Sequence, residues 1–380
     1  MTIATFHPVL VHGRSAWDLG ELPRDEYEER RRRVRQVLAA RELSACIVLG
    51  STPSYANLAF LTGVRPGFMS SVMLLHVDHD PVLFAGLGGG RDLYHVRAVN
   101  CVDDVRHYAS PADGARAVLA EWGVSDGSLG IVGARSDVPH ATAVRLEAGL
   151  DGFELVPLDA AFFQLRRRKR SREVALLERS AQVVEQARDA AVAEFLASGR
   201  PHRAALVAER TARLLGARDV RILANLGDGP ELRPISETSG PSAGHLVLHV
   251  GLERSGYWAE STVSFPRRAD AAPAAAAVAA MRAVVRPGAL LSEVAEAALS
   301  QLDGSAARTL TLEIGLGQGL GLGVEEELAI TPTSSAVLEG GEVLSLRCVT
   351  TGTEQEWVAD GSVVEVTGDG PRTLVPSWWA

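Results

Sequence analysis

Lysine is nearly absent from this chain of 380 residues, because Lys169 is the single lysine among 38 basic residues. Enzymes that use pyridoxal phosphate need a lysine for the Schiff base, and P-loop nucleotide sites need one beside a glycine-rich turn. Lys169 instead lies within the basic run Arg166–Arg170, a context that suits neither role. We therefore expect no cofactor of either class, and the sequence indicates no other.

Cysteine and long apolar runs are also scarce. Cys46, Cys101 and Cys348 are far apart and form no CxxC spacing, so we expect buried thiols in place of a zinc knuckle or a disulfide framework. No apolar run approaches the roughly 18 residues of a membrane span, and the first residues lack the basic start and apolar core of a signal peptide. These absences predict a cytoplasmic protein without a membrane partner.

Charge and composition narrow the class of protein further. The formal net charge of -9 disfavours non-specific nucleic-acid binding. A hydrophobic fraction of 46% is typical of a folded globular protein, and 380 residues are enough for two domains of ordinary size.

The first part of the chain alternates short apolar strands with helical stretches. Strands are predicted at residues 45–49, 72–75, 82–85 and 129–132, and a helix at 112–122. A further helix is predicted from a capping box at Asp25–Glu28. This alternation predicts an α/β domain whose sheet is covered by helices.

A basic segment, residues 165–173, marks the predicted boundary between a domain of residues 1–164 and a domain of residues 165–380. Ser171 is expected to cap a long helix that ends at Gly199. A second helix and a strand are expected at 203–215 and 221–226, an alanine-rich helix at 270–285, and a strand-rich region over 308–367.

The most informative stretch is His245–Phe265, which predicts two strands joined by a tight turn. β-Branched and aromatic residues flank the turn residues Glu253–Gly256. With a turn centred on Arg254 and Ser255, His249 lies directly opposite Glu260. The hairpin then places an imidazole beside a carboxylate on one buried face.

This hairpin resembles the metal hairpin of the pita-bread family, which includes creatinase, prolidase, aminopeptidase P and methionine aminopeptidase. Gly256-Tyr257 precedes Glu260 as in the family, and Thr262, Ser264 and Phe265 follow the family's Thr-x-Thr-Phe. Asn57–Gly63 resembles the signature of the family's N-terminal domain. The resemblance implies an α/β N-terminal domain followed by an α+β pita-bread domain.

The resemblance also implies where the two metal ions of metal-using relatives would bind, and all five ligand positions differ here. They hold His249, Glu260, Gln318, Arg347 and Asp360. Together these side chains carry about one negative charge in place of four, so we expect no dinuclear metal site. A single ion held by His249, Glu260 and Asp360 is the alternative, and it requires Arg347 to turn away.

Relatives use two further histidines for substrate, and the matching positions hold Arg233 and Glu325. The creatinase-like branch binds guanidinium with glutamates and the substrate carboxylate with arginines, which implies substrate-binding roles for these two residues and for Arg347, Asp360 and Gln318. His249 remains as the acid/base group, with Glu260 opposite. Structural alternatives to these functional roles stay open. His249 is then a hydrogen-bonded core histidine, Arg347 and Asp360 form an ion pair, and Glu325–Glu327 are a solvated turn.

The resemblance implies a metal-independent enzyme that acts on a small zwitterionic, amidine-like or amino-acid-like molecule. The expected reaction is hydrolysis of a C–N bond, or an elimination or rearrangement by acid/base chemistry. Two alternatives are a pseudoenzyme that binds a peptide or metabolite, as metal-free pita-bread modules do in some histone chaperones, and an Xaa-Pro peptidase with non-standard metal ligands. Relatives complete the pocket with a loop from a second subunit, here Val64–Gly67, so a homodimer is expected with Arg65 as the partner's contribution.

Overall fold

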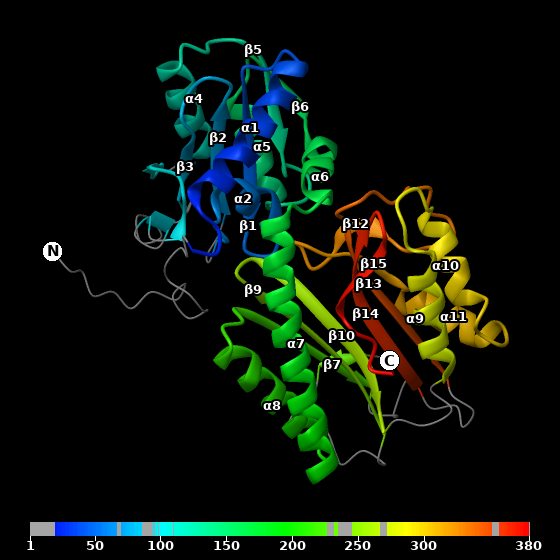
Figure 1. Ribbon diagram of the computed structural model, residues 1–380. Coiled ribbons are helices and arrows are strands. Elements are labelled where there is room, and N and C mark those ends of the chain that lie inside the picture. The colour runs from blue at the N-terminus through cyan, green and yellow to red at the C-terminus, as the bar shows by residue number, and fades with distance from the viewer. Residues whose placement is uncertain are drawn as a thin grey trace. The chain divides into compact units, whose positions relative to one another are not determined.

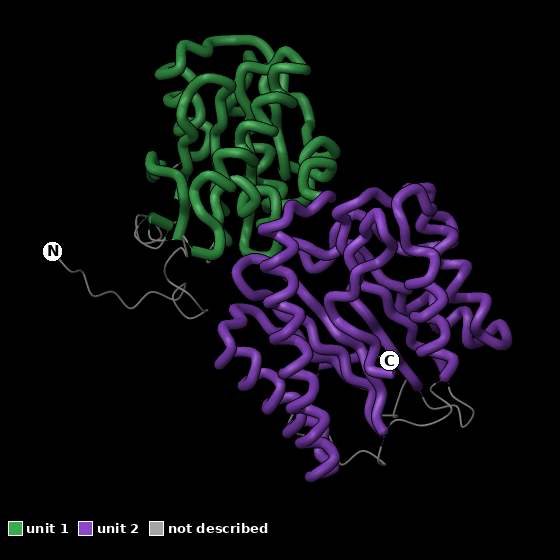
Figure 2. Tube along the Cα trace, in the orientation of Figure 1, with its two compact units in different colours: residues 1–166 green, residues 167–380 purple. Residues whose placement is uncertain are grey.

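The chain divides into two compact units, residues 1–166 and residues 167–380 (Figure 2). The computed structural model describes residues 20–66, 70–85, 93, 96, 97, 99–108, 110–225, 232–234, 245–266, 272–351 and 357–379. Each unit contains one sheet with helices packed against it (Figure 1).

The first unit is built on a six-stranded mixed sheet with the strand order β4-β3-β2-β1-β5-β6. The strands are β1 (Ala45–Ser51), β2 (Ser70–His76), β3 (Val82–Phe84), β4 (Asp104–Arg106), β5 (Gly127–Val132) and β6 (Phe153–Pro157). The helices described in this unit are α1 (Arg24–Ala40), α2 (Ala56–Thr62), α4 (Pro111–Glu121), α5 (His140–Gly149) and α6 (Asp159–Arg167).

Both faces of this sheet are covered, because every residue of β1 and β2 is buried. On one face, Ile47 and Leu74 belong to a core that includes Val118 of α4 and Leu146 of α5. The predicted α/β pattern is therefore confirmed. The expected capping box is wrong in detail, since α1 begins at Arg24 after Pro23 and has no side-chain cap.

The second unit is built on a nine-stranded sheet with the order β12-β11-β13-β14-β10-β9-β7-β8, and β15 pairs with β14 off this path. The first four strands in chain order are β7 (Asp219–Asn225), β8 (Arg233–Pro234), β9 (Leu246–Arg254) and β10 (Tyr257–Phe265). The others are β11 (Gly317–Gly319), β12 (Glu326–Ala329), β13 (Val343–Thr351), β14 (Trp357–Thr367) and β15 (Gly370–Val375).

Helices pack against this second sheet. The helices are α7 (Ser171–Ser198), α8 (Pro201–Leu214), α9 (Ala272–Val284), α10 (Leu291–Leu299) and α11 (Ser305–Ile314). Figure 1 shows α7 running across β9 and β10 with α8 beside it, and α9 packs on β13 and β14. The region 308–367, predicted to be strand-rich, begins within helix α11, because the apolar residues Leu310 and Ile314 recur at helical spacing.

The long helix α7 ends as predicted, with Gly199 in the left-handed region at φ 62° and Pro201 opening α8. Its start differs from the prediction. The carboxylate of Glu173 accepts a hydrogen bond of 3.1 Å from the backbone N–H of Arg170, so Glu173 and not Ser171 caps the helix. Tyr257 of β10 donates a hydrogen bond of 2.8 Å to the same carboxylate and thereby fixes α7 on the sheet.

The three cysteines are buried and unpaired, as the sequence predicts. Burial raises the pKa of Cys46 and of Cys348 to about 12, so neither thiol provides a thiolate nucleophile near neutral pH. Among the described helices, none is long and apolar enough to cross a membrane.

Candidate functional site

The β9–β10 hairpin positions the two central residues, but its turn differs from the expected one. The turn consists of Ser255 and Gly256, whose φ values of 53° and 91° are the positive values that a two-residue hairpin turn favours. Arg254 therefore pairs with Tyr257, and His249 pairs with Thr262, while Glu260 pairs with Gly251. The expected register is wrong by two residues, which leaves each side chain on its expected face.

His249 and Glu260 are consequently diagonal neighbours on one face of the sheet. His249 Nε2 lies 3.9 Å from Glu260 Oε2, and His249 Nδ1 lies 2.9 Å from the hydroxyl of Thr262. Burial lowers the pKa of His249; the charge of Glu260 opposes this shift, whereas Arg347 and Arg221 add to it. His249 is therefore predominantly neutral at neutral pH and can accept a proton.

Glu260 is held by two donors from β13. Arg347 Nη1 lies 3.1 Å from Glu260 Oε1, and the hydroxyl of Ser345 donates to the same oxygen. The carboxylate is buried, with 3% of its side chain exposed, so a paired cation is needed to keep the charged form in the interior. Arg347 is fixed in turn, because its Nε donates to the carbonyl oxygen of Gly315 at 3.2 Å.

Gln318 completes this cluster from β11. It pairs with Ser345, so its side chain is on the face that carries Glu260, and its amide lies 3.4 Å from the carbonyl oxygen of Val324. We call the face that carries His249, Glu260, Gln318 and Arg347 the site face. The structure thus brings four of the predicted site residues together.

Asp360 does not belong to this cluster, which corrects the sequence prediction. It pairs with Val263 of β10, and successive residues of a strand point to opposite faces, so Asp360 and Glu260 lie on opposite faces. The backbone N–H of Trp378 donates to Asp360 at 3.0 Å, and the hydroxyl of Ser377 also donates to it. Burial raises the pKa of Asp360 to about 6, although these two hydrogen bonds oppose the shift.

The residue of β14 beside Arg347 on the site face is Gly361, because the two residues pair. A side-chain carbon at Gly361 would lie 3.2 Å from the Cβ of Thr262 and 3.3 Å from the carbonyl oxygen of Leu346. The predicted position was therefore displaced by one residue, which is enough to change the face. The alternative ion pair between Arg347 and Asp360 is wrong for the same reason.

Arg233 lies on the other face of the sheet, and Glu325 is exposed beside the cluster without a hydrogen bond or ion pair to its described residues. Arg233 pairs with Ala224, whereas Leu223 pairs with His249, so Arg233 projects from the other face of the sheet. Glu325 is exposed, and the buried residue beside it is Glu326. Neither prediction of a substrate-binding role gains support from this geometry.

Arg65 belongs to the first unit, and its guanidinium lies 4.6 Å from the ring centre of Tyr55. Gly67 of the expected partner loop is outside the described residues. The contribution of Arg65 to a second subunit's site stays a prediction.

Sequence reasoning missed two polar features of the second unit. Arg221 of β7 pairs with Gly251, so it lies on the site face, where its guanidinium stacks 4.6 Å from the ring centre of Trp258. Lys169 forms a buried ion pair of 2.8 Å with Glu326. Strand alternation with the correct hairpin register identifies Arg221, whereas no local pattern in the sequence links residues as distant as Lys169 and Glu326.

The site-face residues do not fit the two-metal centre that the resemblance implies for metal-using relatives. Glu260 is the only carboxylate of the cluster, and its Oε1 already accepts from Arg347 and Ser345. Gly361 offers no side-chain ligand. Across the part of the chain that the structure describes, no three His, Cys, Asp or Glu side chains are grouped to hold a metal ion.

Comparisons with known proteins support the fold. Residues 30–168 match the family described as the creatinase/prolidase N-terminal domain, and no curated protein sequence matches the chain. The prolidase from Pyrococcus horikoshii OT3 is similar, with a TM-score of 0.76 and 16% identity over 92% of this chain and 98% of that chain. The X-Pro aminopeptidase from Thermotoga maritima MSB8 is also similar, with a TM-score of 0.75 and 15% identity over 91% of this chain and 97% of that chain.

A third similar structure is the N-terminal domain of the FACT complex subunit SPT16 from chickpea, with a TM-score of 0.68 and 15% identity over 92% of this chain and 96% of that chain. At these identities the solved structures show a common fold and not a common activity. Together with the family match, they confirm the α/β N-terminal domain and the pita-bread domain that the sequence predicts. The chain therefore has the pita-bread fold, with a match to the creatinase/prolidase N-terminal domain over residues 30–168.

Proposed function

We propose that the protein is a metal-independent enzyme that uses acid/base chemistry on a small zwitterionic, amidine-like or amino-acid-like molecule. One observation carries the proposal: a largely buried, neutral His249, with 13% of its side chain exposed, lies 3.9 Å from Glu260, whose charge is balanced by Arg347 at 3.1 Å. An internal guanidinium thus provides positive charge at the site, and a proton acceptor lies beside it.

The residues have separate roles in this proposal. Thr262 orients the ring of His249 through Nδ1, which directs Nε2 toward Glu260. For hydrolysis of a C–N bond, His249 Nε2 accepts a proton from the attacking water and returns it to the leaving nitrogen. The hydroxyl of water is then bonded to carbon, its proton to nitrogen, and His249 ends as it began. Glu260 stabilises the imidazolium that forms between these transfers.

The test is turnover of creatine and of glycyl-proline by the purified protein, each with and without EDTA. We expect turnover of one of these compounds, unchanged by EDTA and reduced about 10²- to 10⁴-fold in His249→Ala. His140→Ala, at an exposed histidine in the first unit, is the matched control and should retain wild-type turnover. Full activity in a folded His249→Ala variant, or activity that EDTA abolishes, would argue against the proposal.

A binding protein without turnover is the second candidate. The observation that favours it is the saturation of Glu260 Oε1 by Arg347 and Ser345, an arrangement that also suits a structural ion pair. This candidate predicts that a ligand binds while no compound is converted, and that His249→Ala leaves its affinity nearly unchanged.

A further inference from the structure

Arg221, Gly251 and Glu260 form one row across three neighbouring strands of the site face. Arg221 of β7 pairs with Gly251 of β9, which pairs with Glu260 of β10. Because neighbouring strands are about 4.8 Å apart, the Cα atoms at the two ends of the row are separated by about 10 Å. A cation and an anion therefore flank a position that has no side chain.

The absent side chain leaves room for a ligand atom. A carbon at the Cβ position of Gly251 would lie 3.5 Å from His249 Nε2 and 3.9 Å from Glu260 Cβ, which are ordinary van der Waals separations. A ligand group can thus contact both proposed acid/base residues from above Gly251. Neither neighbouring side chain has to move for this contact.

Arg221 differs from Arg347 in what surrounds it. Arg347 is paired with Glu260, whereas no carboxylate of the described residues forms an ion pair with Arg221. Arg221 is exposed, and its guanidinium rests on the ring of the buried Trp258. The stacking restricts the side chain while its N–H donors remain available at the ring's edge.

Arg221 also borders open space. Its side chain is exposed on the site face, where it stacks on Trp258. A small molecule can therefore reach the guanidinium from solvent.

We infer that Arg221 is the carboxylate anchor of the site, and that the ligand is a zwitterion whose cationic end lies over Gly251 beside Glu260 and His249. This inference rests on the proposed function and specifies its substrate class. The planar guanidinium matches a carboxylate through two parallel hydrogen bonds. At the other end of the row, Glu260 Oε2 lies 3.9 Å from His249 Nε2. A molecule with separated opposite charges satisfies both ends at once.

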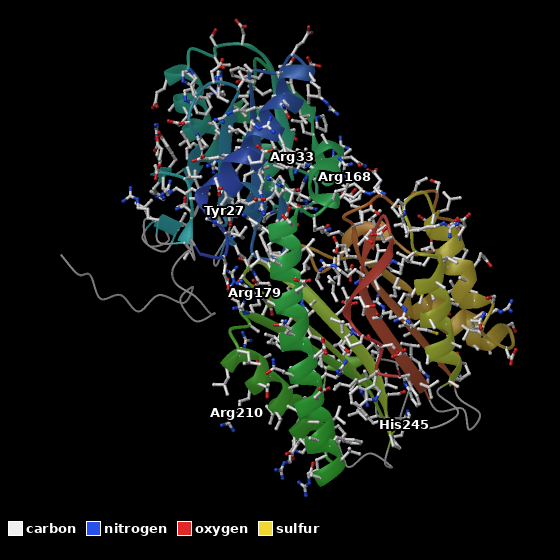
Figure 3. All side chains as sticks on the ribbon, viewed as in Figure 1. Tyr27, Arg33, Arg168, Arg179, Arg210 and His245 are labelled. Atoms are coloured by element: carbon white, nitrogen blue, oxygen red, sulfur yellow. The ribbon has the colours of Figure 1, made fainter. Side chains whose placement is uncertain are left out.

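The experiment is calorimetric titration with γ-guanidinobutyrate and with its uncharged amide, γ-guanidinobutyramide. We expect the wild-type protein to bind the carboxylate more tightly than the amide. Arg221→Met should weaken carboxylate binding by about 10- to 150-fold and leave amide binding unchanged, because only the carboxylate uses the guanidinium. Arg210→Met, which removes an exposed arginine of α8 (Figure 3), changes net charge equally and should bind as the wild type does.

Equal affinity of Arg221→Met and wild type for the carboxylate would overturn the inference, as would equal affinity of the wild type for the two probes or failure of both to bind. The result is separable from the proposed function. Arg221-dependent binding without any turnover would reject the enzymatic proposal and keep the carboxylate anchor. Turnover that depends on His249 but not on Arg221 would keep the enzymatic proposal and reject the carboxylate anchor.

Discussion

Arg347 is the residue on which the charge balance of the site depends. Its guanidinium lies 3.1 Å from Glu260, and both side chains are largely buried, with 19% and 3% exposed. Arg347 was identified from the sequence, but its partner was not. One of the two alternatives from the sequence paired it with Asp360, which lies on the opposite face because the strand was read one residue out of register.

We expect Arg347→Met to lower the free energy of unfolding by about 3 to 5 kcal/mol, because the change leaves a buried carboxylate without its counter-charge. Denaturant unfolding measures this cost. The double variant Arg347→Met with Glu260→Gln should recover most of it, since the stranded charge is then gone. A single-variant loss below about 1 kcal/mol would show that the ion pair contributes little.

Asp360 should make stability depend on pH. Its folded-state pKa of about 6 is above the ordinary value of 3.8, so its contribution is complete below pH 3.8 and is lost as the pH rises through about 6. Asp360→Asn removes this titration. Relative to wild type, the variant should therefore gain stability between about pH 4 and pH 7, by on the order of 3 kcal/mol.

Unfolding experiments across this pH range check the prediction for Asp360. Asp303→Asn, at an exposed aspartate, serves as the control and should follow the wild-type curve. A difference between Asp360→Asn and wild type that does not change with pH would contradict the raised pKa.

Among the elements, the hairpin was predicted most successfully. The two strands and their faces follow from alternation, whereas the register depends on which two residues occupy the turn. Ser255 and Gly256 occupy it because Gly256 adopts φ 91° without cost, a preference that the neighbouring Arg254 does not share. The short strand β11 was not predicted separately, because alternating glycines provide no strand pattern.

The strand β11 depends on Gly317 in particular. A Cβ at Gly317 would lie 1.9 Å from the carbonyl oxygen of Ser345, and the residue has φ 129°. Gly317→Ala should therefore destabilise the protein by about 3 kcal/mol or more. Gly319→Ala in the same strand is the matched control, since its Cβ would lie 3.2 Å from Leu328, and it should cost about 1 kcal/mol. Similar thermal denaturation of the two variants would contradict this account.

For the whole molecule, the two-domain architecture could be predicted because two independent signals agree. The α/β alternation indicates the N-terminal domain, and the hairpin motif identifies the pita-bread domain; the comparisons confirm both. The contents of the site were less predictable. His249, Glu260, Gln318 and Arg347 were found by motif, but Arg221 comes from a strand that carries no motif and joins them only through sheet register.

The homodimer stays a prediction at this scale. If a partner subunit completes the site, light scattering at micromolar concentration should report twice the mass of one chain. Arg65→Ala should then reduce turnover while the dimer persists, because Arg65 is assigned to the site and not to the association. A monomer at that concentration would remove the assignment.

The central claim is that an internal guanidinium, and not a metal ion, provides the positive charge beside Glu260. Elemental analysis of the protein, purified without chelators and then dialysed, tests it most directly. The donor set of one carboxylate, one imidazole and one amide predicts well below one equivalent of manganese, zinc, cobalt or iron per chain. One or two equivalents retained after dialysis in the wild type, and lost in Glu260→Gln, would contradict the claim.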